Sequence, residues 1–102
     1  MMLKNRITVS RENLEQFCKR HRIRKLSFFG SVLRDDFRPE SDIDVLVEFE
    51  AGARIGFLRM AHMENELSEM LERRVDLRTP ADLSRYFRQE VIERAEVQYA
   101  QG

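Results

Sequence analysis

The sequence has a single cysteine, no excess of either charge and no long apolar run. Cys18 has no partner for an internal disulfide and no second cysteine with which to build a zinc site. Lysine plus arginine equal aspartate plus glutamate at 18 each, which argues against a general nucleic-acid binder because such proteins normally carry a basic excess. No apolar run approaches the roughly 20 residues that span a bilayer, and the N-terminus lacks the apolar core of a signal peptide. We therefore expect a cytoplasmic protein.

The composition is that of a folded chain. With 35% charged and 42% hydrophobic residues, it is typical of a globular protein and not of a disordered one. A length of 102 residues suits one small core and leaves little room for a second. We find no internal repeat, linker or low-complexity segment, so one domain is predicted over residues 1–102.

Two aspartates open the clearest strand pattern in the chain, over residues 42–49. The odd-numbered positions from 43 to 49 are all apolar, as on the buried face of a strand. Asp42 and Asp44 share the other face, because side chains two apart on a strand point the same way. Two carboxylates this close repel each other and need solvent or a cation. Hard oxygen ligands of this kind suit Mg²⁺ or Mn²⁺ shared with substrate phosphates.

A glycine and a serine end the preceding apolar strand, which is predicted over residues 24–29. Gly30 has no Cβ to block a close approach of its backbone to a ligand. Ser31 adds a hydroxyl and can cap a short helix predicted over residues 32–36, whose first amides would point at an anion. The two strands together predict a phosphate contact beside a metal site.

Helices account for most of the remaining chain. Apolar residues at helical spacing predict one helix from the Ser10 cap to about residue 21, a second over residues 54–73 and a third over residues 86–97. The second helix is expected to bury Phe57 and Leu67, among others. Thr79 followed by Pro80 predicts a further helix start.

A third strand is predicted over residues 74–77, with Asp76 facing away from its apolar neighbours. A strand, a helix and a strand usually form a crossover within one sheet, so Asp76 can arrive beside Asp42 and Asp44. The alternative is a strand-end residue paired with Arg74 or Arg78. The two aspartates upstream favour a third catalytic carboxylate.

Two further features of the first helix are open to a plain structural interpretation. Cys18 shares a helical stripe with Leu14, Phe17 and His21, so a small buried hydrophobe is expected. The basic cluster over residues 19–25 either attracts a triphosphate or an acidic partner, or is the solvated cationic end of a helix. We favour the solvated helix end.

The motifs resemble those of a known superfamily. Gly30-Ser31, ten intervening residues and then Asp42-x-Asp44 are similar to the G-S-x10-D-x-D signature of the nucleotidyltransferases that include DNA polymerase beta and the kanamycin nucleotidyltransferases. A lone G-S or D-x-D would be weak, but the two at this spacing on two apolar strands are specific.

Finer details resemble the minimal nucleotidyltransferase (MNT) antitoxins that partner HEPN-domain toxins. These details are the small size, Arg34 three residues after Ser31, the string from Ser41 to Asp44, and Arg74-Val75-Asp76-Leu77. The resemblance covers roughly residues 24–99. One departure is Asp35, which stands where many members have glycine after the arginine.

The resemblance implies a fold and a site. The fold would be polymerase-beta-like and of the α/β (α+β) class, a small mixed sheet of three or four strands with helices packed on it. Its catalytic residues and metal ligands would be Asp42, Asp44 and Asp76, holding two Mg²⁺ ions, with Mn²⁺ as a substitute. The nucleotide phosphates would contact Gly30, Ser31 and Arg34. Whether Asp76 acts as metal ligand or general base stays open.

The resemblance also implies an activity. The chain would use ATP to transfer AMP to a tyrosine of a HEPN-domain RNase toxin, with which it forms a hetero-oligomer, and so neutralise it. No direct contact with nucleic acid or membrane is expected. Two alternatives are a non-catalytic antitoxin that acts by binding, and a small-molecule nucleotidyltransferase, although the latter usually carries an additional substrate domain.

Overall fold

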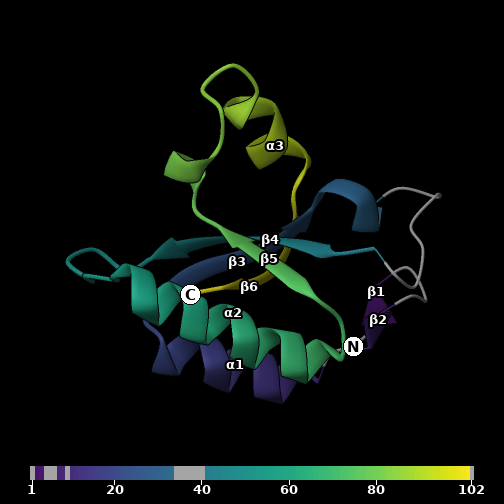
Figure 1. The fold of residues 1–102 in the computed structure, drawn as a ribbon, viewed down its shortest axis with the longest axis vertical. Coiled ribbons are helices and arrows are strands. Elements are labelled where there is room, and N and C mark those ends of the chain that lie inside the picture. Colours follow the sequence, from purple (N-terminus) through teal and green to yellow (C-terminus); the bar gives the residue numbers. More distant parts are fainter. Residues whose placement is uncertain (1, 4–6, 9, 34–40, 102) are drawn as a thin grey trace.

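The computed structural model describes residues 2–3, 7–8, 10–33 and 41–101 of the chain. Its main sheet has four strands in the order β5-β4-β3-β6 (Figure 1). A separate pair joins β1 (Met2–Leu3) to β2 (Ile7–Thr8) in antiparallel register.

The main sheet is mixed. Strand β3 (Ile23–Phe29) is antiparallel to β4 (Ile43–Phe49) on one side and to β6 (Glu96–Ala100) on the other. Strand β5 (Val75–Arg78) pairs in parallel with β4, and helix α2 (Phe57–Leu71) connects the two. This is the predicted crossover, since parallel neighbours need such a connection. The α+β class with a sheet of three or four strands is therefore confirmed.

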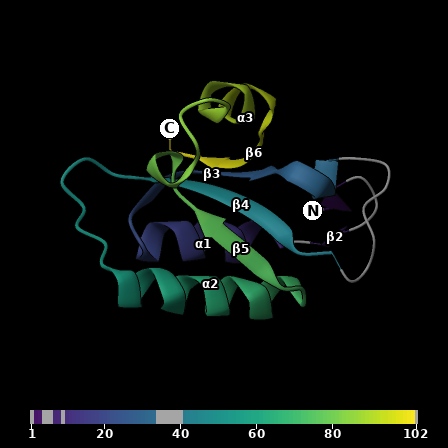
Figure 2. The ribbon, with the colours of Figure 1, turned by 45° about the horizontal axis from the view of Figure 1, so that its top comes forward.

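The two faces of the sheet are covered differently. Helices α1 (Arg11–Arg20) and α2 cover one face, and the short helix α3 (Arg88–Arg94) stands over the opposite face (Figure 1 and Figure 2). None of the helices in the described ranges is both long and apolar enough to cross a membrane. The apolar core lies on the α1 and α2 side and includes Leu14, Phe17, Phe28, Val45, Val47, Met63, Leu67 and Leu77.

Helix α2 also fixes the outer edge of β5. Glu64 Oε2 accepts a hydrogen bond from the amide of Leu77 at 2.8 Å, and Ser68 Oγ accepts one from the amide of Val75 at 3.0 Å. An end strand otherwise leaves such amides without a partner in the sheet. The strand that carries Asp76 is therefore held on both sides.

The C-terminal prediction was wrong in part. A helix was expected over residues 86–97, but α3 ends at Arg94 and the chain then forms β6 along the edge of β3. The local helical spacing was real as far as Ala95, whereas the open edge of β3 offers backbone partners that the sequence pattern does not reveal. At Pro80 the expected helix start is a single 3₁₀ turn, η2 (Pro80–Asp82), in which Asp82 Oδ2 accepts from the amide and hydroxyl of Thr79.

The apolar face of α2 was also assigned partly wrongly. Phe57 was expected inside but is 85% exposed, because it is the first residue of the helix, whereas Met63 is fully buried. Met63, Leu67 and Leu71 form the buried stripe at four-residue spacing.

The prediction for Cys18 is confirmed. It is fully buried between α1 and the sheet, and burial raises the pKa of its thiol to about 12. A thiol with this pKa is not a nucleophile at neutral pH.

Most of the basic cluster pairs with carboxylates of the same chain. Ion pairs join Lys19 to Glu15, Arg20 to Glu66, Arg22 to Glu50 and Arg24 to Glu48. These pairs lie at the end of α1 and at the start of β3, away from Gly30. They agree with a solvated helix end.

Glu66 joins α2 to α1. It accepts from Arg20 at 2.6 Å and lies 2.9 Å from Nε2 of the buried His21, whose Nδ1 has no hydrogen-bond partner among the described residues. Burial alone would raise the pKa of the Glu66 carboxyl. The hydrogen bonds from His21 and Arg20 have the larger combined effect in the opposite direction, so the pKa of Glu66 is lowered below its usual value.

Glu66 should therefore make the stability depend on pH. Because its pKa is lower in the folded than in the unfolded chain, its contribution is present above the unfolded pKa of about 4.3 and is lost as the pH falls through the folded value. Glu66→Gln should lose stability at pH 7 and show a smaller further loss between about pH 5 and pH 3 than the native chain. Urea unfolding across this range measures both.

Glu69→Gln is the matched control, because Glu69 is exposed on the same helix. It should follow the native pH dependence. An acid-induced loss in Glu66→Gln equal to that of the native chain would contradict the assignment.

Candidate active site

Asp44 and Asp76 lie opposite each other on neighbouring strands. In the parallel pairing of β4 with β5 they are register partners. Both are half-buried and alternate with core residues, so they project from the sheet face opposite α1 and α2. The structure thus brings together two of the three predicted carboxylates.

Asp42 lies just before β4. It was expected within a buried strand, but the strand begins at Ile43 and Asp42 is exposed. The backbone around it is fixed from the segment just before β5, since Arg73 Nη2 donates to the Ser41 carbonyl at 2.8 Å and the Ile43 amide donates to the Arg74 carbonyl at 2.8 Å. Asp42 is therefore held at the same end of the sheet as Asp44.

Gly30 packs directly against the Asp44 carboxylate. It follows Phe29, the register partner of Asp44 on β3, and its φ is +73°. A Cβ at this position would lie 2.2 Å from Asp44 Oδ2. Both the positive φ and the close approach require glycine.

Two predicted phosphate ligands are only partly covered by the description. Ser31 belongs to a 3₁₀ turn, η1 (Gly30–Leu33), where a short helix over residues 32–36 was expected. The Ser31 side chain and the whole of Arg34 lie outside the described residues, as does Asp35. Their roles stay predictions.

Asp76 is paired with Arg78, two residues further along β5. Arg78 Nε and Nη2 each donate to one oxygen of the Asp76 carboxylate at 3.1 Å. Hydrogen bonding to Asp76 raises the pKa of Arg78, and the negative charges of Asp76, Asp82 and Asp44 raise it further. The pairing foreseen as the alternative for Asp76 is therefore present, together with its position beside Asp44.

The donor chemistry of the site fits a hard divalent cation. Among residues 10–33 and 41–101, no three side chains of the metal-binding types lie close enough together to hold a metal ion as they stand. Even so, Asp44 and Asp76 lie in adjacent register, and the missing side chain of Gly30 leaves room for the Asp44 carboxylate itself. Carboxylates are the preferred protein ligands of Mg²⁺ and Mn²⁺.

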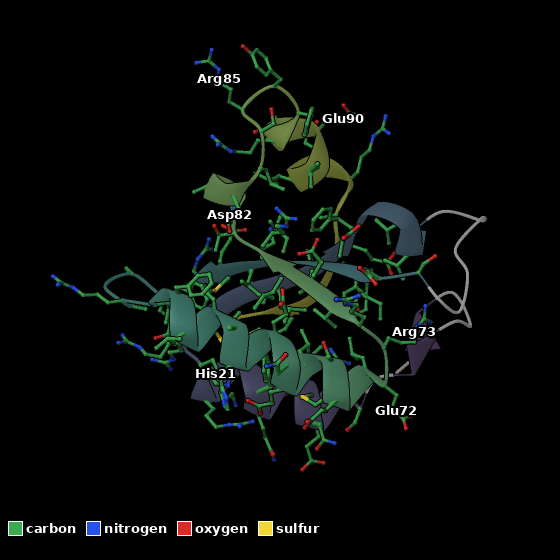
Figure 3. All side chains as sticks on the ribbon, in the orientation of Figure 1. His21, Glu72, Arg73, Asp82, Arg85 and Glu90 are labelled. Carbon is green, nitrogen blue, oxygen red and sulfur yellow. The ribbon has the colours of Figure 1, made fainter. Side chains whose placement is uncertain are left out.

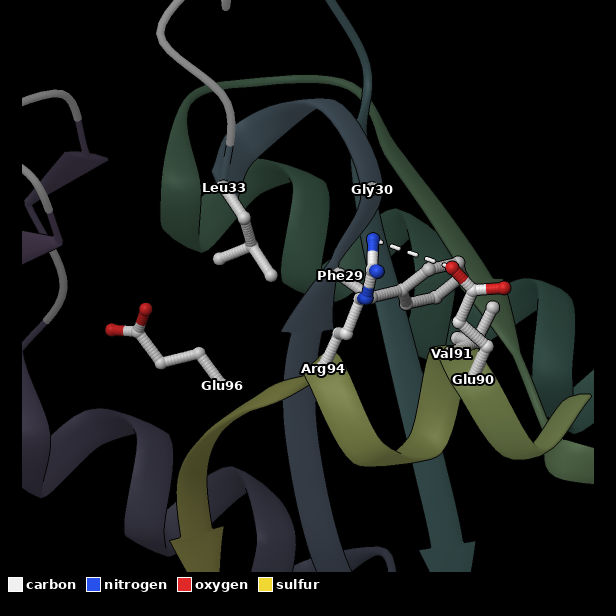
Figure 4. A pocket seen from close by; sticks show the side chains of 7 residues that line it. All are labelled: Phe29, Gly30, Leu33, Glu90, Val91, Arg94 and Glu96. Atoms are coloured by element: carbon white, nitrogen blue, oxygen red, sulfur yellow. Dashed lines mark ion pairs between the residues drawn. The ribbon is translucent and has the colours of Figure 1, made fainter.

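A pocket of about 600 Å³ opens beside Gly30 (Figure 4). Helix α3 forms one wall with Arg94 and Glu90, which are 3.3 Å apart, and Leu33 of η1 lies across from them. This volume lies within the usual range for small-molecule pockets. Its lining residues are Phe29, Gly30, Leu33, Glu90, Val91, Arg94 and Glu96.

The sequence did not single out Arg94, and it offered Arg78 only as one of two possible partners of Asp76. Each belongs to a short-range ion pair that is common on protein surfaces, and no spacing distinguishes it. The signal was the fold itself, which places α3 over η1 and Arg78 on the Asp76 side of β5. Figure 3 shows Asp82, Glu90 and Arg85 on the side of the sheet opposite His21.

A model of the nucleotidyltransferase domain matches residues 10–98. The chain belongs to this family. A Methanocaldococcus jannaschii protein provisionally named a protein adenylyltransferase is 31% identical to this nucleotidyltransferase over 71 residues, or 70% of each chain. The protein adenylyltransferase MntA of Thermococcus cleftensis is 36% identical over 59 residues, which are 58% of this chain and 58% of that one.

Solved structures show the same fold. A structure provisionally described as a minimal nucleotidyltransferase is 35% identical, with a TM-score of 0.68, and the match covers 83% of this chain and 85% of that one. A toxin–antitoxin crystal structure with AMP-PNP gives a TM-score of 0.72 at 17% identity, over 91% of this chain and 75% of that one. The MNT antitoxin complex with the tri-AMPylated HEPN toxin of Shewanella oneidensis gives 0.59 at 16%, over 89% and 70%.

These findings confirm the family and the fold that the motifs predicted. They also confirm that the chain is an enzyme of the nucleotidyltransferase class. The likenesses below 25% identity bear on the fold alone.

Proposed function

We propose that this chain is an antitoxin that transfers AMP from ATP to a HEPN-domain toxin and thereby neutralises it, acting as one domain over residues 1–102. The observation that carries the proposal is the register of Asp44 and Asp76 on adjacent strands, with Gly30 against the Asp44 carboxylate. A scaffold that only binds its partner has no physical need for such an arrangement of charge. Relatives named protein adenylyltransferases, and a related fold in complex with an AMPylated HEPN toxin, support the substrate and the partner.

The predicted site residues have separate roles in binding the nucleotide and the metal ions. The Gly30 amide and the Ser31 hydroxyl hold the outer phosphates of ATP, and Arg34 offsets their charge. The pocket beside Gly30 is large enough to receive part of the nucleotide. Asp42, Asp44 and Asp76 would hold two Mg²⁺ or Mn²⁺ ions. When bound, such ions lower the pKa of an attacking hydroxyl and offset charge on the phosphates.

The acceptor is a tyrosine hydroxyl of the toxin. Its oxygen forms a bond to the α-phosphorus as the bond from that phosphorus to the bridging oxygen breaks, and pyrophosphate leaves. The hydroxyl proton passes to Asp76 if Asp76 is the general base, or to water if Asp76 serves only as a ligand. Phe29 and Asp44 are register partners on paired strands, so Gly30, the next residue after Phe29, stays beside Asp44 and helps to keep the bound nucleotide in line for attack.

Intact-mass measurement of the toxin tests the proposal. The protein encoded beside this chain, which the proposal takes to be the toxin, is co-expressed with the native chain, with the double variant Asp42→Asn/Asp44→Asn, or with Glu48→Gln. Glu48 lies on the same strand and face as Asp44, but it pairs with Arg24 away from the site. We expect the toxin to gain mass in AMP units with the native chain and with Glu48→Gln, and none with the double variant.

Two other results would contradict the proposal. A toxin of unchanged mass that binds both the native chain and the double variant would indicate the binding-only antitoxin. A toxin modified equally by the double variant would remove the aspartates from the reaction.

A further inference from the structure

Arg78 occupies both oxygens of a carboxylate that the proposed reaction needs. Its two donating nitrogens each lie 3.1 Å from one oxygen of Asp76. This two-pronged contact is the geometry in which a guanidinium binds a carboxylate most specifically. A divalent cation that used Asp76 would have to replace Arg78 at these oxygens.

The surrounding charge explains why a cation stands there. Asp44 lies opposite Asp76 in register, and the charge of Asp82 also acts on Arg78. Neighbouring carboxylates repel one another unless a positive charge lies between or beside them. Arg78 supplies that charge from within the chain.

The two partners of this ion pair differ in mobility, since the Arg78 side chain is exposed, whereas the Asp76 backbone is less free to move. The Arg78 side chain is 47% exposed, and ion pairs this open contribute little net stability. Asp76, in contrast, sits on a strand held by β4 on one side and by Glu64 and Ser68 of α2 on the other. The guanidinium can therefore move while the carboxylate keeps its place.

We propose that Arg78 is an internal counter-ion that occupies both carboxylate oxygens of Asp76 until a nucleoside triphosphate binds. The triphosphate offers the guanidinium a second set of paired oxygens, and Asp76 is then released to the divalent cation that comes with the nucleotide. This inference rests on the proposed function, because it assumes that Asp76 serves the nucleotide site. Its consequence is that cation and nucleotide assist each other's binding, and such coupling is reciprocal.

Calorimetric titration with Mn²⁺ tests the inference without measuring catalysis. Affinity is measured with and without a non-hydrolysable ATP analogue for the native chain, Arg78→Gln, Arg78→Lys and Arg85→Gln. Arg85 lies at the tip of the η2 to α3 segment, over the ring of Tyr86, so its variant makes the same charge change away from the carboxylates (Figure 3).

Without nucleotide, Arg78→Gln should bind Mn²⁺ roughly fivefold or more tightly than the native chain, and the analogue should add less to its affinity. Arg78→Lys keeps the charge but loses the two-pronged contact, so its affinity should fall between the two. Arg85→Gln should behave as native, and circular dichroism checks that every variant is folded.

Three results would overturn the inference. Equal Mn²⁺ affinity of Arg78→Gln and the native chain would show that Arg78 does not compete for Asp76. Equal tightening in Arg85→Gln would assign the effect to net charge alone. If the native chain bound neither Mn²⁺ nor the analogue, the proposed function itself would fail, and the inference with it.

Discussion

Replacing Asp44 with asparagine is expected to slow AMP transfer by roughly a thousandfold or more, equivalent to about 4 kcal/mol of transition-state stabilisation. The change removes a charge without changing volume. Asp44 faces Asp76 on the side of the sheet away from α1 and α2, so the core keeps its contacts. The initial rate of AMP incorporation into the toxin measures the effect, and a thermal melt shows that the variant is folded.

Glu48→Gln is the matched control for this prediction. It makes the same charge change on the same face of β4, and the residue pairs with Arg24 instead of the site. Its transfer rate should remain within about threefold of native, as expected for an exposed pair of little energetic weight. An Asp44→Asn chain that kept a large part of the native rate, or a Glu48→Gln chain that lost as much, would contradict the assignment.

Replacing Gly30 with alanine is expected to abolish most of the transfer activity and to destabilise the fold. The positive φ alone costs about 1–2 kcal/mol with a Cβ present. The new methyl group would also lie 2.2 Å from Asp44 Oδ2, so the carboxylate or the strand must shift. Displacing a reacting group by about 1 Å can cost on the order of a hundredfold in rate.

Gly52→Ala separates the two causes. Gly52 has a φ of +83°, but no atom outside its own neighbourhood in the chain lies within 4 Å of an added Cβ. This variant should show the backbone cost in urea unfolding, about 1–2 kcal/mol, and retain the native transfer rate. Equal losses of activity in the two glycine variants would mean that the loss at Gly30 reflects stability and not the contact with Asp44.

The centre of the site was predictable because its causes are local. Alternation over residues 42–49 specified which face of β4 carries Asp44, and the strand, helix and strand order placed Asp76 on the adjacent strand. The close approach at Gly30, directly after β3, could be predicted because glycine has no side chain to block it. Each inference needed only the pleat of a strand and the usual crossover connection.

The surroundings of the site were not predictable because their causes are distant in sequence. Strand β6 exists because β3 offers it an edge, and this contact overrides a local helical pattern near residue 95. Helix α3 forms a wall of the pocket beside Gly30 because β6, which directly follows α3, pairs with the edge of β3. Likewise, the pattern allowed either Arg74 or Arg78 as the partner of Asp76, and only the side-chain geometry identifies Arg78.

The alternation of side chains along β4 places different constraints on substitutions at its two faces. Val45 is fully buried against the helices, while its neighbour Asp44 opens to the other side. Substitutions on the helix side are limited by packing, and those on the open side mostly leave the packed core untouched. Under the proposed function, substitutions around this face could therefore change the acceptor protein with little loss of folded protein at each step. One layer of backbone is enough to let specificity drift while the fold is conserved.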